Sequence, residues 1–310
     1  MWLKRPARAE SGVGSTNGDA LVLAPAVPGM VADLKRQAAQ DGLSVEVQSG
    51  NATANATASD LEITLARAGQ GICTWHIRGV RRIYRAAVVI DDLGQDMQRT
   101  RAVLALPYPL TLSVLPHLPA SRETSAAAAL AGREVMLHLP MEPIGDRISP
   151  GQGAIVVGMR APEVARIVDA DLDSVPNASG VNNHMGSRAT SDPALMAAVM
   201  KELAARRMYF IDSRTAPSTV ALDAARHAGI PAFYRSVFLD DTETVDYTLS
   251  QLRTFRGVVE RQGTALAIGH PHPTTVTALE KFLPELEGDD IELVPASQLV
   301  RLPDVARLSP

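Results

Sequence analysis

The sequence predicts an α/β protein whose main domain is an irregular (β/α) barrel of seven or eight parallel strands, preceded by a small α+β module. From residue 86 onward, short apolar runs alternate with amphipathic stretches across polar or Pro/Gly-containing breaks, as in a parallel sheet covered by helices. A chain of 310 residues with 46% apolar side chains can bury a large core. Six of the apolar runs lead, directly or after one glycine, into Asp, Asn or His.

The first 85 residues depart from this pattern. Residues 1–18 are rich in Gly, Ser, Arg and Glu without an apolar period, so we expect a disordered tail there. Residues 19–85 are expected to form the small α+β module, interrupted by a polar, low-complexity loop at 49–59. The predicted elements of the module are, in chain order, a helix at 28–39 and strands at 43–48, 61–66 and 73–80.

Residues 86–310 are expected to form the barrel domain. One of its helices should begin at residues 191–193, where a capping residue precedes a proline. A longer helix is expected at 242–262, with Asp240 and Asp241 as its N-cap and first-turn charges. The predicted strands are 87–90, 110–115, 134–137, 179–181, 208–211, 235–239, 264–268 and 291–294.

Polar, chemically reactive residues follow these strands. The carboxyl ends of parallel barrel strands all face one side, so residues distant in the sequence converge on one cleft. That convergence predicts an enzyme. The residues concerned are Asp91, Asp92, His138, Asn182, Asn183, His184, Asp212, His270 and His272.

Three of these residues are predicted to bind a divalent metal ion: Asp92, His138 and His184. Two imidazoles with a carboxylate form a common set for first-row divalent ions, and three protein ligands leave a position for an activated water. The adjacent pair Asp91 and Asp92 suits one metal ligand beside one general base, because two close carboxylates repel unless a cation or a proton lies between them. The alternatives are a capping role for the two aspartates and simple hydrogen bonding for the histidines.

His270 and His272 are predicted to supply the general acid, since residues two apart in an extended segment share one face. Alternatively, Pro271 shapes a tight loop and only one of these histidines enters the cleft. Glu142 is predicted as a metal ligand or as a supporting partner. Residues predicted to contact substrate or to support the ligands are Glu142, Asn182, Asn183, Ser187 and Asp212.

Composition excludes several classes of protein. A net charge of −4 and the absence of a basic, aromatic-rich stripe argue against a nucleic-acid partner. The sequence contains no P-loop, no dinucleotide fingerprint and no nucleophile elbow. It also lacks an apolar run of the roughly 18 residues that a membrane helix needs. The single Cys73 cannot form an intrachain disulfide, and residues 1–6 are not followed by the apolar segment of a secretory signal.

Six motifs, in one order along the chain, resemble the divergent polysaccharide deacetylase family. The resemblance runs from about residue 86 to residue 302, and residues 1–85 lie outside it. The motifs are Val-Ile-Asp-Asp-Leu-Gly (89–94), Glu-Val-Met-Leu-His-Leu-Pro-Met-Glu-Pro (134–143), Gly-Val-Asn-Asn-His-Met-Gly-Ser (180–187), Phe-Ile-Asp-Ser (210–213), Val-Phe-Leu-Asp-Asp (237–241) and Ile-Gly-His-Pro-His-Pro (268–273).

This family is a distant relative of the metal-dependent chitin and peptidoglycan deacetylases, and the resemblance implies an irregular (β/α) barrel. It also implies that Asp91 is the general base, that Asp92 and His138 bind the metal, and that His270 is the late catalytic histidine. His184 has no counterpart in those enzymes, and Glu142 stands where they place a second histidine. Both tryptophans, Trp2 and Trp75, precede the barrel, so the tryptophan typical of the acetyl pocket is missing.

The leading hypothesis is that the protein removes N-acetyl or O-acetyl groups from a polysaccharide or peptidoglycan-type substrate with the help of Zn²⁺. A second hypothesis is a non-catalytic barrel that binds a glycan or an envelope partner and retains the metal for stability. A third is a metal-dependent esterase or phosphoesterase acting on small molecules. The resemblance suggests the cell envelope, whereas the first residues suggest no export, so the sequence leaves the compartment open, as it does the oligomeric state.

Overall fold

The computed structural model of the chain describes residues 20–23, 27–49, 60–79, 84–145, 149–288 and 290–300. Its Cα positions divide into two compact units, residues 1–82 and 83–310, and each is described by itself. This division falls just before the expected start of the barrel at residue 86. The expected disordered tail (1–18) lies outside the described residues, as does the expected loop at 49–59 apart from Ser49.

The first unit is a four-stranded sheet with one helix, as the α+β prediction requires. Its sheet has the strand order β1-β4-β3-β2, in which β2, β3 and β4 are antiparallel and β1 is parallel to β4. Ile63 and Ala66 are buried on β3, and Ala38 is buried on the helix. The elements are β1 (Ala20–Leu23), α1 (Val27–Gln40), β2 (Ser44–Ser49), β3 (Asp60–Arg67) and β4 (Gln70–Gly79).

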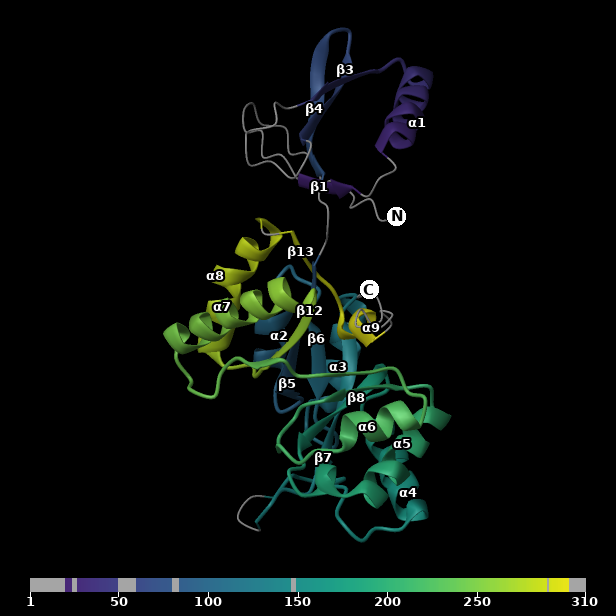
Figure 1. Cartoon of the computed structure of the whole chain (residues 1–310), viewed down its shortest axis with the longest axis vertical. Coiled ribbons are helices and arrows are strands. Elements are labelled where there is room, and N and C mark those ends of the chain that lie inside the picture. Colours follow the sequence, from purple (N-terminus) through teal and green to yellow (C-terminus); the bar gives the residue numbers. More distant parts are fainter. Residues whose placement is uncertain are drawn as a thin grey trace. The chain divides into compact units, whose positions relative to one another are not determined.

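The second unit contains a curled, nine-stranded parallel sheet with helices around its outside (Figure 1), which confirms the predicted fold class. The strand order is β10-β9-β8-β7-β6-β5-β12-β11, and β13 pairs with the start of β5. The strands are β5 (Tyr84–Leu93), β6 (Thr111–Val114), β7 (Glu134–Met141), β8 (Ala178–Met185), β9 (Tyr209–Asp212), β10 (Ala232–Tyr234), β11 (Val237–Phe238), β12 (Thr264–Gly269) and β13 (Ile291–Leu293).

The helices of this unit follow the strands along the chain, which is why the strands can all run parallel. They are α2 (Met97–Leu104), α3 (Ser121–Leu130), α4 (Ala161–Ser174), the 3₁₀ turn η1 (Ala189–Ser191), α5 (Pro193–Ala205), α6 (Ala221–His227), α7 (Val245–Gln262), α8 (Pro273–Gly288) and α9 (Ala296–Val300). None of the described helices is both long and apolar enough to cross a membrane.

One stretch of chain joins the two edges of the curled sheet. β10 pairs with β9, and two residues later β11 pairs with β12. Between them, the Arg235 N–H donates to the carbonyl of Asp212 at 2.9 Å, whereas the Ser236 N–H donates to the carbonyl of Leu266 at 2.7 Å. This segment therefore closes the sheet into an irregular barrel. The strand predicted at 235–239 contains β11, which pairs with β12, but it does not include β10, which lies just before it.

The buried residues form two cores because successive strand residues point to opposite faces. On β5, Val88 and Ile90 belong to the core between sheet and helices, whereas Ala87 and Val89 belong to the core inside the barrel. Asp91 continues the inner series. The same alternation places further polar residues on the inner side, namely Ser113, His138, Asn182 and His184.

The predicted start of the helix at residues 191–193 is confirmed, since Asp192 caps α5 by accepting a hydrogen bond from the Leu195 N–H at 2.9 Å. The expected capping of the long helix by Asp240 and Asp241 is wrong. Helix α7 begins at Val245, and its N-cap is Thr244, whose hydroxyl accepts from the Tyr247 N–H. Asp240 is therefore available for another contact.

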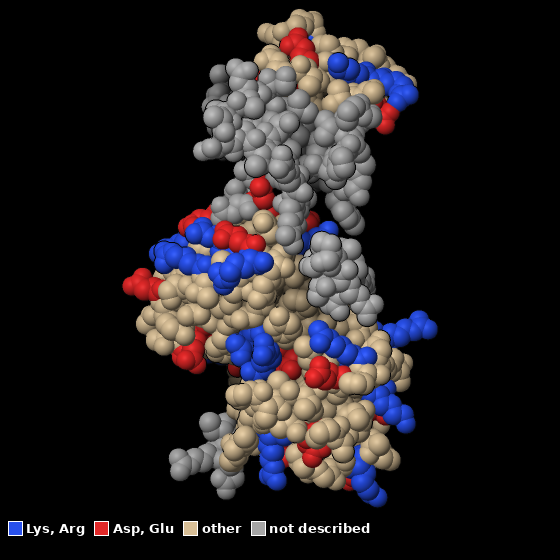
Figure 2. All heavy atoms as spheres, viewed as in Figure 1, with Lys and Arg blue, Asp and Glu red and all other residues tan. Residues whose placement is uncertain are grey.

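On the face of the second unit seen in Figure 2, acidic and basic side chains are mixed.

Candidate metal centre and active site

The adjacent aspartates Asp91 and Asp92 reach the same side of β5 because the strand contains a β-bulge. Val89 and Ile90 pair with Thr111 and Leu112, but the next pair is Leu93 with Val114, so the two aspartates oppose Ser113 alone. The backbone φ angle of Asp92 is 56°, which lies in the left-handed region. A bulge redirects a side chain in this way, and such strained positions concentrate at functional sites. The strand thus continues to Leu93, three residues beyond the predicted end at Ile90.

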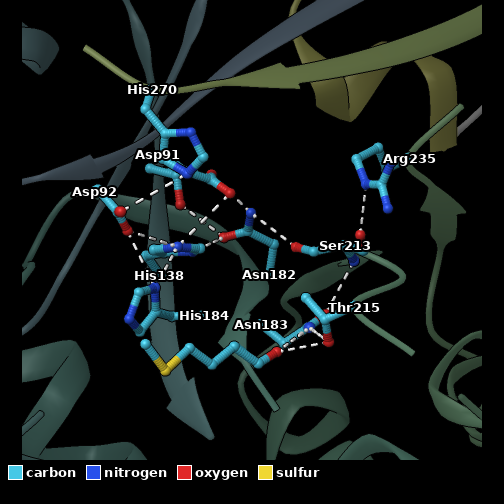
Figure 3. Close-up of polar contacts among 12 residues, drawn as sticks. Asp91, Asp92, His138, Asn182, Asn183, His184, Ser213, Thr215, Arg235 and His270 are labelled. Carbon is cyan, nitrogen blue, oxygen red and sulfur yellow. Dashed lines mark hydrogen bonds and ion pairs between the residues drawn. The ribbon is translucent and has the colours of Figure 1, made fainter. Parts of the chain in front are cut away.

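Three potential ligand atoms form a nearly equilateral triangle (Figure 3). Asp92 Oδ1 lies 3.2 Å from His138 Nε2 and 3.0 Å from His184 Nδ1, and the two nitrogens are 3.1 Å apart. Ligands at about 2.0–2.2 Å from an ion, with angles of roughly 90–110°, lie about 2.8–3.6 Å from one another. Asp92 Oδ1 is buried and has no hydrogen-bond donor of suitable geometry within the described part of the chain. These three residues fit a divalent ion.

The electrostatics of the triangle show how strongly its groups depend on a shared positive charge. Burial acts to raise the pKa of Asp92, but the imidazoles of His138 and His184 outweigh it and hold the pKa well below its usual range. Burial acts to lower the pKa of His138, but the carboxylates of Asp91 and Asp92 raise it above its usual value. A cation could replace the proton that these residues otherwise share.

Asp91 and His138 share a buried partner, Asn182, on the neighbouring strand β8. The Asn182 amide donates to Asp91 Oδ1 at 2.8 Å, and its oxygen lies 2.8 Å from His138 Nδ1. Asp91 Oδ2 lies 3.6 Å from His138 Nε2, at the edge of the ligand triangle. The predicted base and the predicted ligands are therefore in one hydrogen-bonded group.

His270 and Asp240 form a hydrogen-bonded pair beside the ligand triangle. His270 Nδ1 lies 3.0 Å from Asp240 Oδ1, and its backbone N–H donates to Asp240 Oδ2 at 2.6 Å. Thr275 also donates to Asp240 Oδ2, at 2.7 Å. The Nδ1 contact leaves Nε2 on the side of the triangle, 3.7 Å from Asp92 Oδ2. Burial acts to lower the pKa of His270, but Asp240 and the other nearby carboxylates raise it to about 9.

His272 occupies a different position from His270. Its Nδ1 lies 3.5 Å from Glu243 Oε2, and its ring centroid is 5.8 Å from that of His270. Asp240, His270 and His272 also form a second group of close potential ligand atoms. Because Asp240 already accepts three hydrogen bonds from His270 and Thr275, we interpret that group as support for His270.

The remaining predicted residues support loops around the site. Glu142 accepts from the Val157 N–H at 2.7 Å and pairs with Arg188 at 2.9 Å. Ser187 accepts from the Ile144 N–H at 2.8 Å. Neither side chain belongs to the ligand triangle, so the geometry favours a supporting role for Glu142 over direct metal binding.

Asn183 and Asp212 stabilise the turn after β9. Asn183 Oδ1 accepts from the Ser213 N–H at 2.9 Å, and Asn183 Nδ2 donates to the Met185 carbonyl at 2.8 Å. Asp212 accepts from the Arg214 N–H at 2.8 Å and from the Thr219 hydroxyl at 3.0 Å. Both residues therefore fix the backbone beside the site, while their own side chains are engaged in these contacts.

Sequence reasoning missed Asp240 and Ser113 as parts of the site. Ser113 lies opposite the bulge and its hydroxyl is 2.6 Å from Asn182 Oδ1. Its only signal in the sequence is an isolated polar residue inside the apolar run 110–115. Asp240 carried a stronger signal, since its motif repeats the strand-end Asp-Asp pattern of Asp91 and Asp92.

Comparison with known proteins places the barrel in a family. The sequence model for divergent polysaccharide deacetylases matches residues 88–300, and these residues include the bulge, the ligand triangle and His270. The chain belongs to the divergent polysaccharide deacetylase family. The resemblance seen in the six motifs is therefore confirmed.

Two sequence relatives in this comparison are uncharacterized proteins. The chain is 38% identical to YibQ of Escherichia coli over 226 residues, which cover 73% of this chain and 70% of the relative. It is 35% identical to a protein of Haemophilus influenzae over 217 residues, which cover 70% of this chain and 77% of the relative.

Solved structures show the same fold. An uncharacterized protein of Agrobacterium tumefaciens matches with a TM-score of 0.68 and 24% identity, covering 70% of this chain and 89% of the other. A putative cellobiose-phosphate cleavage protein of Enterococcus faecalis matches with a TM-score of 0.52 and 15% identity, covering 70% of this chain and 99% of the other. Family and fold together support a polysaccharide deacetylase-like hydrolase.

Proposed function

We propose that the barrel is a zinc-dependent hydrolase that removes acetyl groups from a cell-envelope polysaccharide, such as a peptidoglycan-type glycan. The observation that carries the proposal is the triangle of Asp92, His138 and His184, with Asp91 at one edge and His270 at another. Two imidazole nitrogens and one carboxylate oxygen form a ligand set that zinc prefers and that leaves room for substrate or water.

Asp91 is the proposed general base. A bound divalent ion would polarise the acyl carbonyl and lower the pKa of a water molecule. Asp91 Oδ1 is engaged by Asn182, so Oδ2 is the oxygen that faces the triangle and would accept the proton of the attacking water. The burial of Asp91, which is 3% exposed, keeps bulk water from competing for that proton.

His270 is the proposed general acid. When its Nδ1–H donates to Asp240, the second nitrogen faces the site and can hold a proton for the departing amine or alcohol. Asp240 is fully buried at its carboxylate and holds His270 through two contacts, one with the imidazole Nδ1 and one with the backbone N–H. His272 lacks such a fixed orientation toward the triangle, so we assign it to the rim of the cleft.

The test is the metal content of the purified protein together with acetate release from acetylated chitooligosaccharides and peptidoglycan fragments. We expect about one zinc ion per chain, and its loss in a His138→Ala/His184→Ala variant, together with at least about 100-fold lower acetate release. A matched control is His227→Ala, which removes an exposed imidazole on α6 and should change neither quantity.

Two results would count against the proposal in different ways. A chain that binds no metal after reconstitution at neutral pH would contradict the metal-dependent mechanism. A chain that binds zinc, releases no acetate from any glycan and yet hydrolyses simple chromogenic esters would instead be a small-molecule esterase. Zinc binding with glycan affinity but no hydrolysis of either substrate would indicate a non-catalytic barrel.

A further inference from the structure

Asn182 is a fully buried amide at the centre of the polar network inside the barrel. It lies on the inner face of β8, in register with His138 on β7. Four side chains lie within hydrogen-bond distance of it: His138, Asp91 and Ser213, which Figure 3 labels, and Ser113. No other residue of the site contacts both the proposed base and a proposed ligand through side-chain hydrogen bonds among the described residues.

The orientation of the Asn182 amide follows from its partners. A carboxylate only accepts hydrogen bonds, so the NH₂ group must face Asp91 Oδ1, at 2.8 Å. The carbonyl oxygen then faces Ser113 Oγ at 2.6 Å and His138 Nδ1 at 2.8 Å. Rotating the amide by half a turn would place its oxygen against the carboxylate, in a buried site where that repulsion is costly.

This orientation fixes the proton of His138. Because Asn182 Oδ1 can only accept, the neutral His138 that binds a metal must carry its proton on Nδ1, which directs its Nε2 lone pair toward Asp92 and His184. Metal-binding histidines generally rely on such an acceptor for the second ring nitrogen. The other end of the same amide holds Asp91 Oδ1 and leaves Oδ2 as the proton acceptor.

We propose that Asn182 is a positioning residue that sets both the metal-binding tautomer of His138 and the orientation of the base Asp91. The part concerning His138 rests on the metal site alone, and the part concerning Asp91 rests on the proposed function. One side chain would thus couple metal binding to proton transfer through its two ends.

The two ends can be separated by substitution. Asn182→Asp keeps an acceptor for the His138 Nδ1–H but replaces the donor to Asp91 with a second carboxylate oxygen. We expect this variant to bind Co²⁺ or Zn²⁺ within about threefold of the wild type, with the same visible Co²⁺ spectrum, while acetate release falls at least about 100-fold. Asn182→Ala removes both ends and should weaken metal binding by about 10–100-fold as well.

The matched control is Asn177→Asp, which adds the same charge at an exposed position just before β8 and should leave metal binding and turnover unchanged. Thermal melts identify any variant that fails to fold. If Asn182→Ala fails to fold, the comparison of Asn182→Asp with the wild type carries the test. Equal loss of metal in Asn182→Asp and Asn182→Ala would overturn the tautomer argument. Full turnover in Asn182→Asp would overturn the argument for Asp91.

The metal measurements also keep this inference distinct from the proposed function. If the wild type binds Co²⁺ but releases no acetate, the proposed function fails, whereas the difference in Co²⁺ affinity between Asn182→Asp and Asn182→Ala still decides the role of Asn182 toward His138. Identical affinities in the wild type and in Asn182→Ala would contradict that role.

Discussion

Asp240 contacts both the imidazole and the backbone N–H of His270, which makes it a test of the proposed acid at the scale of one residue. Asp240→Asn keeps the size of the side chain but removes the charge that faces His270 Nδ1 and the His270 N–H. We expect turnover to fall by about 10²-fold or more, because general acid catalysis contributes about 10²–10⁴-fold. Metal content should stay at the wild-type value, since Asp240 is outside the ligand triangle.

The measurement is acetate release beside elemental analysis. Asp241→Asn is the matched control, because Asp241 is the exposed neighbour of Asp240. Unchanged turnover in Asp240→Asn would show that His270 needs no fixed orientation and would remove it as the acid. Loss of metal in that variant would instead place Asp240 among the groups that hold the ion.

The residue scale also shows where sequence reasoning ended. Asp91, Asp92, His138, His184 and His270 could be predicted because each follows an apolar run of a parallel barrel, and the structure brings them together. Asp240 also follows an apolar run, but the sequence favours a capping role for it because an aspartate shortly before a helix is first of all a capping residue. Only the pairing of Phe238 with Ile268 brings it to His270, 30 positions away in the sequence.

At the scale of elements, the same limit applies to features that depend on register. The alternation of strands and helices predicted the barrel, since periodicity is a local property of the sequence. Two features depend on which residues of neighbouring strands face each other. They are the bulge at Asp91 and Asp92, and the two short strands β10 and β11, which pair with β9 and β12. Register is set by packing across the whole sheet, so the sequence predicted these strands without their exact pairing.

Helix α4 carries a buried carboxyl group that links it to the loop after β6. Asp171 is fully buried and its Oδ1 lies 2.6 Å from His117 Nε2. Its carboxyl group also packs against the backbone of Gly153, where an added Cβ would lie 2.1 Å from Oδ1. Burial raises the pKa of Asp171 to about 8. The protonated acid can then donate to His117 Nε2, at 2.6 Å.

This raised pKa predicts how stability depends on pH. The unfolded chain loses the Asp171 proton near pH 4, whereas the folded protein keeps it to about pH 8, so the free energy of unfolding should fall as pH rises between these values. Asp171→Asn removes the titration. We expect a melting temperature at least about 3 °C above the wild type at pH 8, and a smaller gain or none at pH 4.5.

The control for this prediction is Asp173→Asn, an exposed aspartate on the same helix that should not change the pH dependence. Thermal melts from pH 4.5 to pH 8.5 provide the measurement. A wild type that gains stability relative to Asp171→Asn as pH rises would show that Asp171 is ionised in the folded protein.

At the scale of the whole molecule, the two units divide core and chemistry unequally. Each unit has its own buried residues, but Asp91, Asp92, His138, His184 and His270 all belong to residues 83–310. The match to the deacetylase family, at residues 88–300, also lies within the second unit. We therefore propose that residues 83–310 form the catalytic domain and that residues 19–82 are a separate module.

A chain shortened to residues 83–310 tests this division. Because every proposed ligand and its supporting network lie in the second unit, we expect the shortened chain to bind zinc with the stoichiometry of the full chain and to unfold in one cooperative transition. Acetate release from small acetylated oligosaccharides should also be retained. If the shortened chain folds cooperatively but loses zinc, the first unit contributes to the metal centre. If it keeps zinc and activity on oligosaccharides but fails on polymeric glycan, the first unit acts in recruiting the polymer, which assigns the two units separate roles in one reaction.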